Sequence, residues 1–421
     1  MSTNLLQPSA VRQLSRREVV DKYPEVSPFV ILKADVQRRS LRYTERALAT
    51  LDRKKHQVNV RHQFAISSDH GEAVFPFSLL LRDGTSVISG PDARAEAPYV
   101  VDYLDGRTVI VDGGEIVDEV EFWPQHDFLD KFTSSGKPMW QIAGFSRPQR
   151  LDFAPYCYCH FWDNGHGCRY CNIGSLVKKA KETGSIDLRL APQDVYETVR
   201  EALKQTGRYV NILLSGGSIP GADHTFEEEV QVYIETLQAI GAAFDTRRFP
   251  SQLVASAFTE KQLERIYEQT GLLSYTTDLE VLDEEKFNWI CPGKAETVGY
   301  REWRRRLIAA VDIFGRGRVS TAIVSGVNMA QPHGCSSEDE ALEETLAGVE
   351  DLARHGISVA TCAWNPCEGS AFHKQKTPSL EFHVRLARGI AEIARQYGLD
   401  ADMDNYRRCG NHASTDLLRI A

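Results

Sequence analysis

The chain has 421 residues, of which 42% are hydrophobic and 25% are charged, the ordinary balance of a soluble globular protein. Its formal net charge is −9, from 58 acidic and 49 basic residues. Nucleic-acid-binding proteins usually carry a basic surface that neutralises phosphates, so this balance argues against nucleic acid as a substrate. No apolar run approaches the roughly 20 residues of a membrane span, and the first residues lack the pattern of a secretion signal. We therefore expect a cytoplasmic protein without membrane attachment.

Residues 1–145 are expected to form a flanking region that contains helices and a small β unit. A charged stretch at 38–54 predicts a helix. Short apolar segments at 75–81, 99–103 and 108–111 are separated by turns rich in Gly and Asp, which is typical of an antiparallel β unit. This unit is predicted to cap or flank the remainder of the chain.

From residue 146 to about 400, apolar strands alternate with amphipathic helices. The expected strands are 150–154, 210–214, 252–257, 273–281, 318–324 and 358–364. The expected helices between and after them are 192–205, 226–240, 260–268, 299–314, 339–355 and 380–397. Such alternation predicts the α/β class with parallel strands, and six units favour a partial (βα)6 barrel of the TIM type. In such barrels the chemistry lies at the carboxyl ends of the strands.

Four of the nine cysteines fall within a short segment directly after the first expected barrel strand: Cys157, Cys159, Cys168 and Cys171. In a reducing compartment this grouping indicates metal binding more than a disulfide framework. Three thiolates hold a [4Fe–4S] cluster and leave one iron open for an outside ligand. We predict Cys159, Cys168 and Cys171 as the ligands, with Cys157 as the alternative to Cys159.

Two other functions remain compatible with this segment. Cys157, His160 and His166 supply enough further ligands for zinc, and a zinc-dependent barrel hydrolase would use a metal-activated water. The second alternative is a non-catalytic iron–sulfur binding or scaffold protein. The position of the cysteines after a barrel strand favours the cluster, because structural zinc more often holds small independent modules.

The segment Cys168-Arg169-Tyr170-Cys171 resembles the second half of the cysteine motif of the radical S-adenosylmethionine (SAM) superfamily. Its first interval differs, since eight residues separate Cys159 from Cys168 where three are usual. The order of the later motifs is nearest to the biotin synthase and hydrogenase-maturation branch. The resemblance implies reductive cleavage of SAM at a [4Fe–4S] cluster to a 5′-deoxyadenosyl radical, which abstracts hydrogen from a small-molecule substrate. It also implies an electron donor such as flavodoxin or ferredoxin.

The same resemblance assigns residues to SAM by their place in the motif order. A Gly-Gly turn after the second strand would receive the methionine amino group, and two acids after the fourth strand would contact the ribose. An arginine of the following helix would bind the carboxylate, and an aromatic and a fifth-strand residue would pack on adenine. These residues are Ser215, Gly216, Gly217, Ser218, Asp278, Glu280, Arg304, Tyr170 and Ile323.

Two further segments stand out without a motif of their own. The segment Cys291-Pro292-Gly293-Lys294 is distinctive, but the sequence assigns it no chemical role. The tail, residues 401–421, is rich in reactive side chains and is expected to close the barrel or the site. Within it, Cys409 is the candidate hydrogen donor or ligand, and an ordinary free thiol is the alternative.

Overall fold

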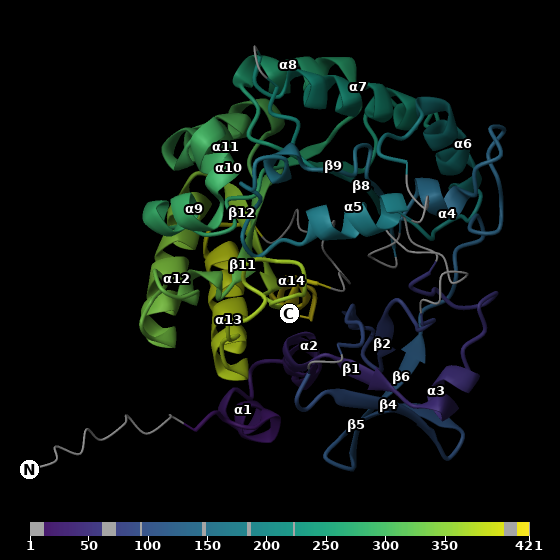
Figure 1. Cartoon of the computed structure of the whole chain (residues 1–421), viewed down its shortest axis with the longest axis vertical. Helices are drawn as coiled ribbons and strands as arrows, with labels where there is room; N and C mark the ends of the chain where they lie inside the picture. The colour runs from purple at the N-terminus through teal and green to yellow at the C-terminus, as the bar shows by residue number, and fades with distance from the viewer. Residues whose placement is uncertain are drawn as a thin grey trace, which may run out of the picture.

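The computed structural model describes residues 12–60, 73–92, 95–144, 149–182, 187–221, 224–399 and 411–420. They build two six-stranded sheets with helices around them (Figure 1). The second sheet carries the candidate site, and the first flanks it. None of the helices in these ranges is long and apolar enough to cross a membrane.

The second sheet is entirely parallel, and its strands lie side by side in chain order. They are β7 (Arg150–Phe153), β8 (Asn211–Ser215), β9 (Ser251–Val254), β10 (Ser274–Thr276), β11 (Val319–Ser325) and β12 (Ile357–Ala363). Every residue of β7 and the first four of β8 are buried, as expected for strands covered on both faces. The sheet curls into a half-barrel with β7 and β12 as its edges (Figure 1). The predicted α/β class and the parallel pairing of six strands are confirmed, and the curled sheet agrees with a partial barrel.

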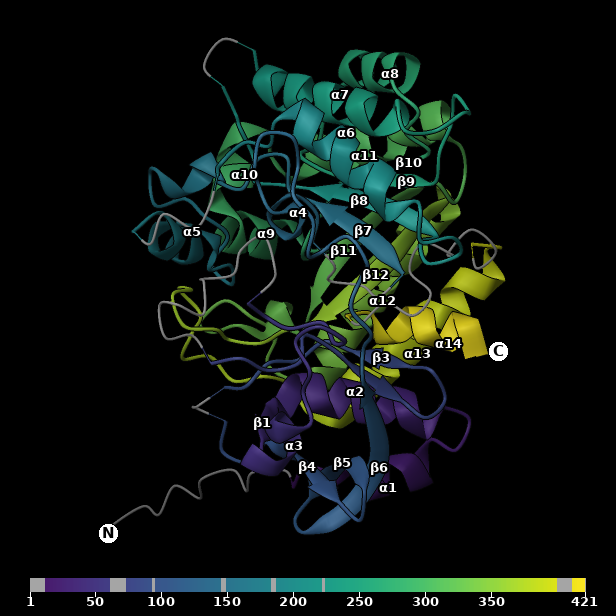
Figure 2. The ribbon, with the colours of Figure 1, turned by 90° about the vertical axis from the view of Figure 1, so that its right-hand side faces the viewer.

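The helices that follow the strands form an arc around the outside of the curled sheet (Figures 1 and 2). They are α6 (Pro192–Ala202), α7 (Glu227–Gly241), α8 (Glu260–Gln269), α11 (Tyr300–Phe314), α12 (Glu338–Arg354) and α13 (Leu380–Gln396). Side-chain caps fix several of their starts: Thr259 forms a capping box with Gln262, and Ser379 accepts the N–H of Phe382. All six predicted helices are therefore present, with ends shifted by a few residues.

Three short helices near the carboxyl ends of the strands were not predicted. They are α5 (Ile173–Glu182), α9 (Glu284–Ile290) and α10 (Pro292–Thr297). The strand expected at 273–281 ends at Thr276. Residues 277–279 are not part of a strand, and Glu280, which adopts a φ of +67° in the left-handed region, forms a single bridge to Ile323.

The first sheet has the order β1-β4-β5-β6-β2-β3. Its strands are β1 (Leu41–Tyr43), β2 (Leu79–Leu81), β3 (Ser86–Val87), β4 (Tyr99–Leu104), β5 (Arg107–Asp112) and β6 (Glu115–Phe122). The prediction of one helix over residues 38–54 was wrong. α2 (Pro28–Arg39) ends before it, because Ser40 has a φ of +69° and the next residues pair with β4 in parallel, followed by α3 (Glu45–Ala49).

The remaining elements are helices and turns that lie outside the strands of the two sheets. α1 (Arg16–Lys22) precedes α2, α4 (Met139–Ile142) precedes β7, and α14 (Ala413–Ile420) lies near the carboxyl terminus. Two 3-10 turns, η2 (His160–Trp162) and η3 (Val327–Met329), follow β7 and β11. α2 packs against both α13 and α14 (Figure 2). At this junction Lys33 and Asp416 form a fully buried ion pair with a distance of 2.6 Å.

Candidate active site

A cavity of about 340 Å³ lies at the carboxyl ends of β7, β8, β9 and β10. Four groups of predicted residues line it: the cysteines of the loop after β7, the turn after β8, the two acids after β10, and Tyr170. The residues concerned are Cys157, Cys159, Cys168, Cys171, Tyr170, Ser215, Gly216, Gly217, Ser218, Asp278 and Glu280. The fold thus brings together in one place side chains that are up to about 120 residues apart in the sequence.

Backbone contacts hold the cysteine loop against the turn after β8. The N–H of Gly217 donates to the carbonyl of Tyr156 at 3.1 Å, and the N–H of His160 donates to the carbonyl of Ser218 at 3.0 Å. A Cβ on Gly216 would lie 2.6 Å from the Tyr156 carbonyl oxygen, and one on Gly217 would clash with the backbone of Tyr158. The two glycines are therefore required because the backbone of the cysteine loop passes too close for any side chain.

Burial disfavours the free thiolate of two of the three predicted ligands. Burial raises the pKa of Cys159, and it raises the pKa of Cys171 to about 12. A hydrogen bond with Cys291 lowers the pKa of Cys168. Bound iron supplies the positive charge that offsets this burial, because thiolates are the ligands of iron–sulfur clusters. Three thiols lining one cavity therefore fit a cluster.

Other observations bear on the choice among the ligands. Among the described residues, no three His, Cys, Asp or Glu side chains converge closely enough to hold a single metal ion. Cys157 is buried, and its thiol lies 3.6 Å from the Ala154 carbonyl oxygen, to which it donates. His160 and His166 each lie 2.7 Å from a carboxylate, those of Asp163 and Glu296.

The segment Cys291-Pro292-Gly293-Lys294 packs directly on the cysteine loop, at the junction of α9 and α10. The N–H of Gly293 donates to the His166 carbonyl at 2.9 Å, and the N–H of Arg169 donates to the Ile290 carbonyl at 2.8 Å. A Cβ on Gly293 would lie 2.5 Å from the Phe161 ring. This segment therefore supports the loop through contacts separate from those of the β8 turn, and it carries Lys294 into the cavity.

Lys294 and the two acids after β10 form one largely buried charged group. The Lys294 ammonium donates to the Glu280 carboxylate and to the Asp278 carbonyl, both at 2.7 Å. Burial and the charge of Glu280 raise the pKa of Asp278 to about 6, and the Asp278 carboxylate accepts the N–H of Ala322 at 2.8 Å. Burial alone would lower the pKa of Lys294, but the carboxylate of Glu280 and the nearby thiols raise it. Lys294 is the only lysine or arginine among the described residues that line this cavity.

Glu229 on α7 was not predicted, yet it fastens the β8 turn to the end of β9. Its carboxylate accepts the N–H groups of Ile219 at 2.9 Å and Ser256 at 3.1 Å, and the Ser256 hydroxyl at 2.9 Å. The Ser256 hydroxyl also lies 2.9 Å from that of Ser218. Burial raises the pKa of Glu229 to about 7. In the sequence it is the third of three consecutive acids, which resemble an ordinary exposed helix start.

Two predicted residues are not brought to the cavity, and a third lies outside the described residues. Arg304 on α11 pairs with Asp351 of α12 on the outside of the sheet. Ile323 is buried within β11 and bridges to Glu280, but it does not line the cavity. Cys409 lies outside the described residues. Helical spacing explains the case of Arg304, since two positions further along Arg306 points inward and donates to the Ala257 carbonyl at 2.9 Å.

Comparisons with known proteins found a similar curated protein and similar solved structures. No family model matches the chain. The bacteriochlorophyllide c C-7(1)-hydroxylase of Chlorobaculum limnaeum is 28% identical over 280 residues, which cover 64% of this chain and 66% of the hydroxylase. A radical SAM methyltransferase from Sphaerobacter thermophilus, known from its crystal structure, is 15% identical with a TM-score of 0.40, over 97% of this chain and 100% of that one.

Proposed function

Since the chain belongs to the radical SAM superfamily and is an enzyme, we propose that it cleaves SAM reductively at a [4Fe–4S] cluster held by Cys159, Cys168 and Cys171. The observation that carries this proposal is the single cavity that contains the three thiols, the Gly-Gly turn and the buried acids. When bound, the cluster supplies the electron that splits the sulfur–carbon bond, giving methionine and a 5′-deoxyadenosyl radical. Flavodoxin or ferredoxin is the proposed source of that electron.

The residues around the cysteines are proposed to bind and orient SAM. The turn from Ser215 to Ser218 would receive the methionine amino group, and the carboxylates of Asp278 and Glu280 would accept from the ribose hydroxyls. Tyr170 lines the cavity, and its aromatic ring would pack on adenine. Ile323 would support that packing from behind Glu280.

For the SAM carboxylate we propose Lys294 in place of Arg304. The Lys294 ammonium donates to Glu280 and to the Asp278 carbonyl, so one of its three N–H groups remains to donate to a second carboxylate, and burial strengthens that attraction. Glu280 sits in a strained backbone conformation of a kind that costs about 1–3 kcal/mol and concentrates at functional sites. In this conformation the Glu280 carboxylate accepts a hydrogen bond from Lys294 and would also contact the cofactor.

The substrate is proposed to be a small molecule from which the radical removes hydrogen. The related hydroxylase is named for a reaction at one carbon of bacteriochlorophyllide c, which agrees with attack on a C–H bond. We propose the same class of attack for this chain. The division into a flanking region 1–145, a barrel 146–400 and a closing tail 401–421 belongs to the same proposal, with Cys409 as the candidate hydrogen donor of the tail.

The ligand assignment is tested by counting metal after purification without oxygen. Wild type and Cys157→Ala are expected to retain about four irons and four sulfides per chain, and Cys159→Ala to lose most of them. Zinc in stoichiometric amount without iron would favour the barrel hydrolase instead. Loss of iron in Cys157→Ala together with retention of iron in Cys159→Ala would instead assign Cys157 as the first ligand.

A further inference from the structure

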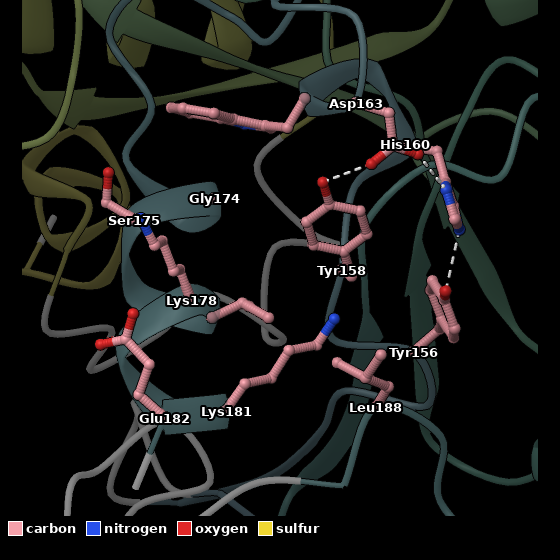
Figure 3. Close-up of a pocket in the computed structure, with 12 residues that line it drawn as sticks. Tyr156, Tyr158, His160, Asp163, Gly174, Ser175, Lys178, Lys181, Glu182 and Leu188 are labelled. Carbon is pink, nitrogen blue, oxygen red and sulfur yellow. Dashed lines mark hydrogen bonds and ion pairs between the residues drawn. The ribbon is translucent and has the colours of Figure 1, made fainter.

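A second cavity, of about 670 Å³, lies between the cysteine loop and α5 (Figure 3). Its size falls within the range of about 300–1,000 Å³ that is typical of small-molecule sites. Trp162 lines both this cavity and the cysteine cavity, so the two adjoin at that side chain. We call the second one the outer cavity; none of the residues predicted to hold iron or SAM lines it.

Aromatic rings form one wall of the outer cavity. Trp162 is held in place by two glycines: a Cβ on Gly167 would lie 2.6 Å from the indole nitrogen, and one on Gly174 would clash with the ring. The indole can therefore lie flat against the start of α5 and has little room to move. Tyr156 and Tyr158 continue the same wall. Flat, fixed rings of this kind favour a flat ligand, because stacking adds to the burial of apolar surface.

Asp163, the acid on this aromatic wall, already forms hydrogen bonds with other residues of the wall. Asp163 accepts the hydroxyl of Tyr158 at 2.5 Å and lies 2.7 Å from Nδ1 of His160, whose Nε2 lies 2.8 Å from the Tyr156 hydroxyl (Figure 3). The hydrogen bond to Asp163 raises the pKa of Tyr158 to about 12. The network fixes the two tyrosine rings, and Asp163 keeps its negative charge within reach of the Lys181 ammonium.

The opposite wall provides positive charge. Lys178 and Lys181 lie three positions apart on α5 and both line the outer cavity. Within the described ranges neither makes an ion pair with a carboxylate, and the Lys181 ammonium lies 5.2 Å from the centre of the Tyr158 ring (Figure 3). Glu182 is the one other acid of the lining, at the end of α5. The lining therefore holds two lysines that form no ion pair within the described ranges, beside two acids of which Asp163 already accepts from Tyr158.

We propose that the outer cavity anchors the substrate, and that the substrate is a flat ring system that carries a carboxylate. The ring would stack on Tyr158 and Trp162, and the carboxylate would pair with Lys178 and Lys181. Its far end would reach the cysteine cavity past Trp162, which the two cavities share. The assignment of the ligand as substrate rests on the proposed radical chemistry, whereas the binding of a flat carboxylate does not.

The test measures binding to the reconstituted full-length enzyme with 1-pyrenecarboxylate and its neutral analogue 1-pyrenemethanol, by fluorescence anisotropy. The acid is expected to bind at least tenfold more tightly than the alcohol. Lys178→Gln and Lys181→Gln should each weaken the acid about fivefold, the effect of a partly exposed ion pair. Lys179→Gln is the matched control, since it removes one charge from the same helix without lining the cavity.

Equal affinity for the acid and the alcohol would overturn the proposal, as would equal weakening by Lys179→Gln, which would mean attraction to the general charge of α5. Cleavage of SAM without substrate should be unchanged in Lys179→Gln, because Lys179 lines neither cavity. In a further outcome, the wild type fails to cleave SAM while Lys178→Gln and Lys181→Gln still weaken binding of the acid and Lys179→Gln does not. That result would contradict the radical chemistry and still support a site for an anionic ligand.

Discussion

At the scale of single residues, the cavity depends on a lysine and a glutamate that no motif identified. Lys294 is 8% exposed and is paired with Glu280, and Glu229 is 2% exposed and accepts three hydrogen bonds. Both are charged groups removed from water, which proteins tolerate only where partners are present. Each therefore gives a substitution with a specific expected effect.

Replacing Lys294 tests which cation receives the SAM carboxylate. Lys294→Met removes the positive charge and leaves Glu280 buried without its partner, a change that costs several kcal/mol in comparable cases. We expect SAM to bind at least tenfold more weakly to the reconstituted variant in equilibrium dialysis. Arg304→Met, which breaks only the outer pair with Asp351, should change the affinity less than twofold. The reverse pattern would restore Arg304 as the carboxylate ligand.

Glu229 gives a prediction on pH. Its pKa of about 7 in the folded chain lies above the ordinary value of 4.5, so the folded state binds this proton more tightly than the unfolded state. The group therefore makes folding less favourable as pH rises from about 4.5 to 7, by an amount on the order of 3 kcal/mol. Relative to Glu229→Gln, the wild type should lose thermal stability between pH 5 and pH 7. A difference in Tm that stays constant over this range would contradict the shift.

At the scale of elements, the β8 turn and the cysteine loop form one unit. Gly217→Ala should prevent the loop from approaching β8, since the new Cβ would meet the Tyr158 backbone, which has no freedom to move aside. We expect iron per chain to fall to less than half of the wild-type value after reconstitution. Gly90→Ala is the control, because its Cβ would meet only ordinary contacts at 3.6 Å and beyond. Normal iron content in Gly217→Ala would show that the loop holds the metal without this contact.

The sequence predicted the parallel sheet well and its surroundings less well. Long periodic segments such as 380–397 determine their own structure, and a buried strand is recognisable from its continuous apolar run. The short helices α9 and α10 are held by contacts with the cysteine loop, which local pattern does not contain. For the same reason the sequence did not show which side of α11 faces inward. Arg304 pairs with Asp351 on the outer side, although the helix itself was predicted.

At the scale of the whole molecule, the amino-terminal sheet is fastened to the half-barrel through α2. Lys33 on α2 and Asp416 on α14 pair with both side chains fully buried, while the nearby pair of Lys22 with Glu381 is exposed. Both pairs join a helix of the flanking region to a helix near the carboxyl terminus. One pair is buried and the other is exposed to solvent. Their substitution therefore compares a buried with an exposed ion pair within one protein.

Lys33→Ala is expected to destabilise the chain by about 3–5 kcal/mol, because it leaves Asp416 charged and buried without its partner. Lys22→Ala should cost about 1 kcal/mol or less. Thermal unfolding followed by circular dichroism compares them, and Lys33→Met combined with Asp416→Leu should recover much of the loss. Equal effects of Lys33→Ala and Lys22→Ala would mean that the buried pair does not hold the junction.

The central claim is that this cavity cleaves SAM, and 5′-deoxyadenosine formation tests it most directly. The reconstituted enzyme is mixed with SAM and a strong reductant without oxygen, and 5′-deoxyadenosine and methionine are quantified by chromatography. We predict equal amounts of both products from the wild type and from Cys157→Ala, and none from Cys159→Ala. An iron-loaded wild type that forms no 5′-deoxyadenosine under these conditions would contradict the account.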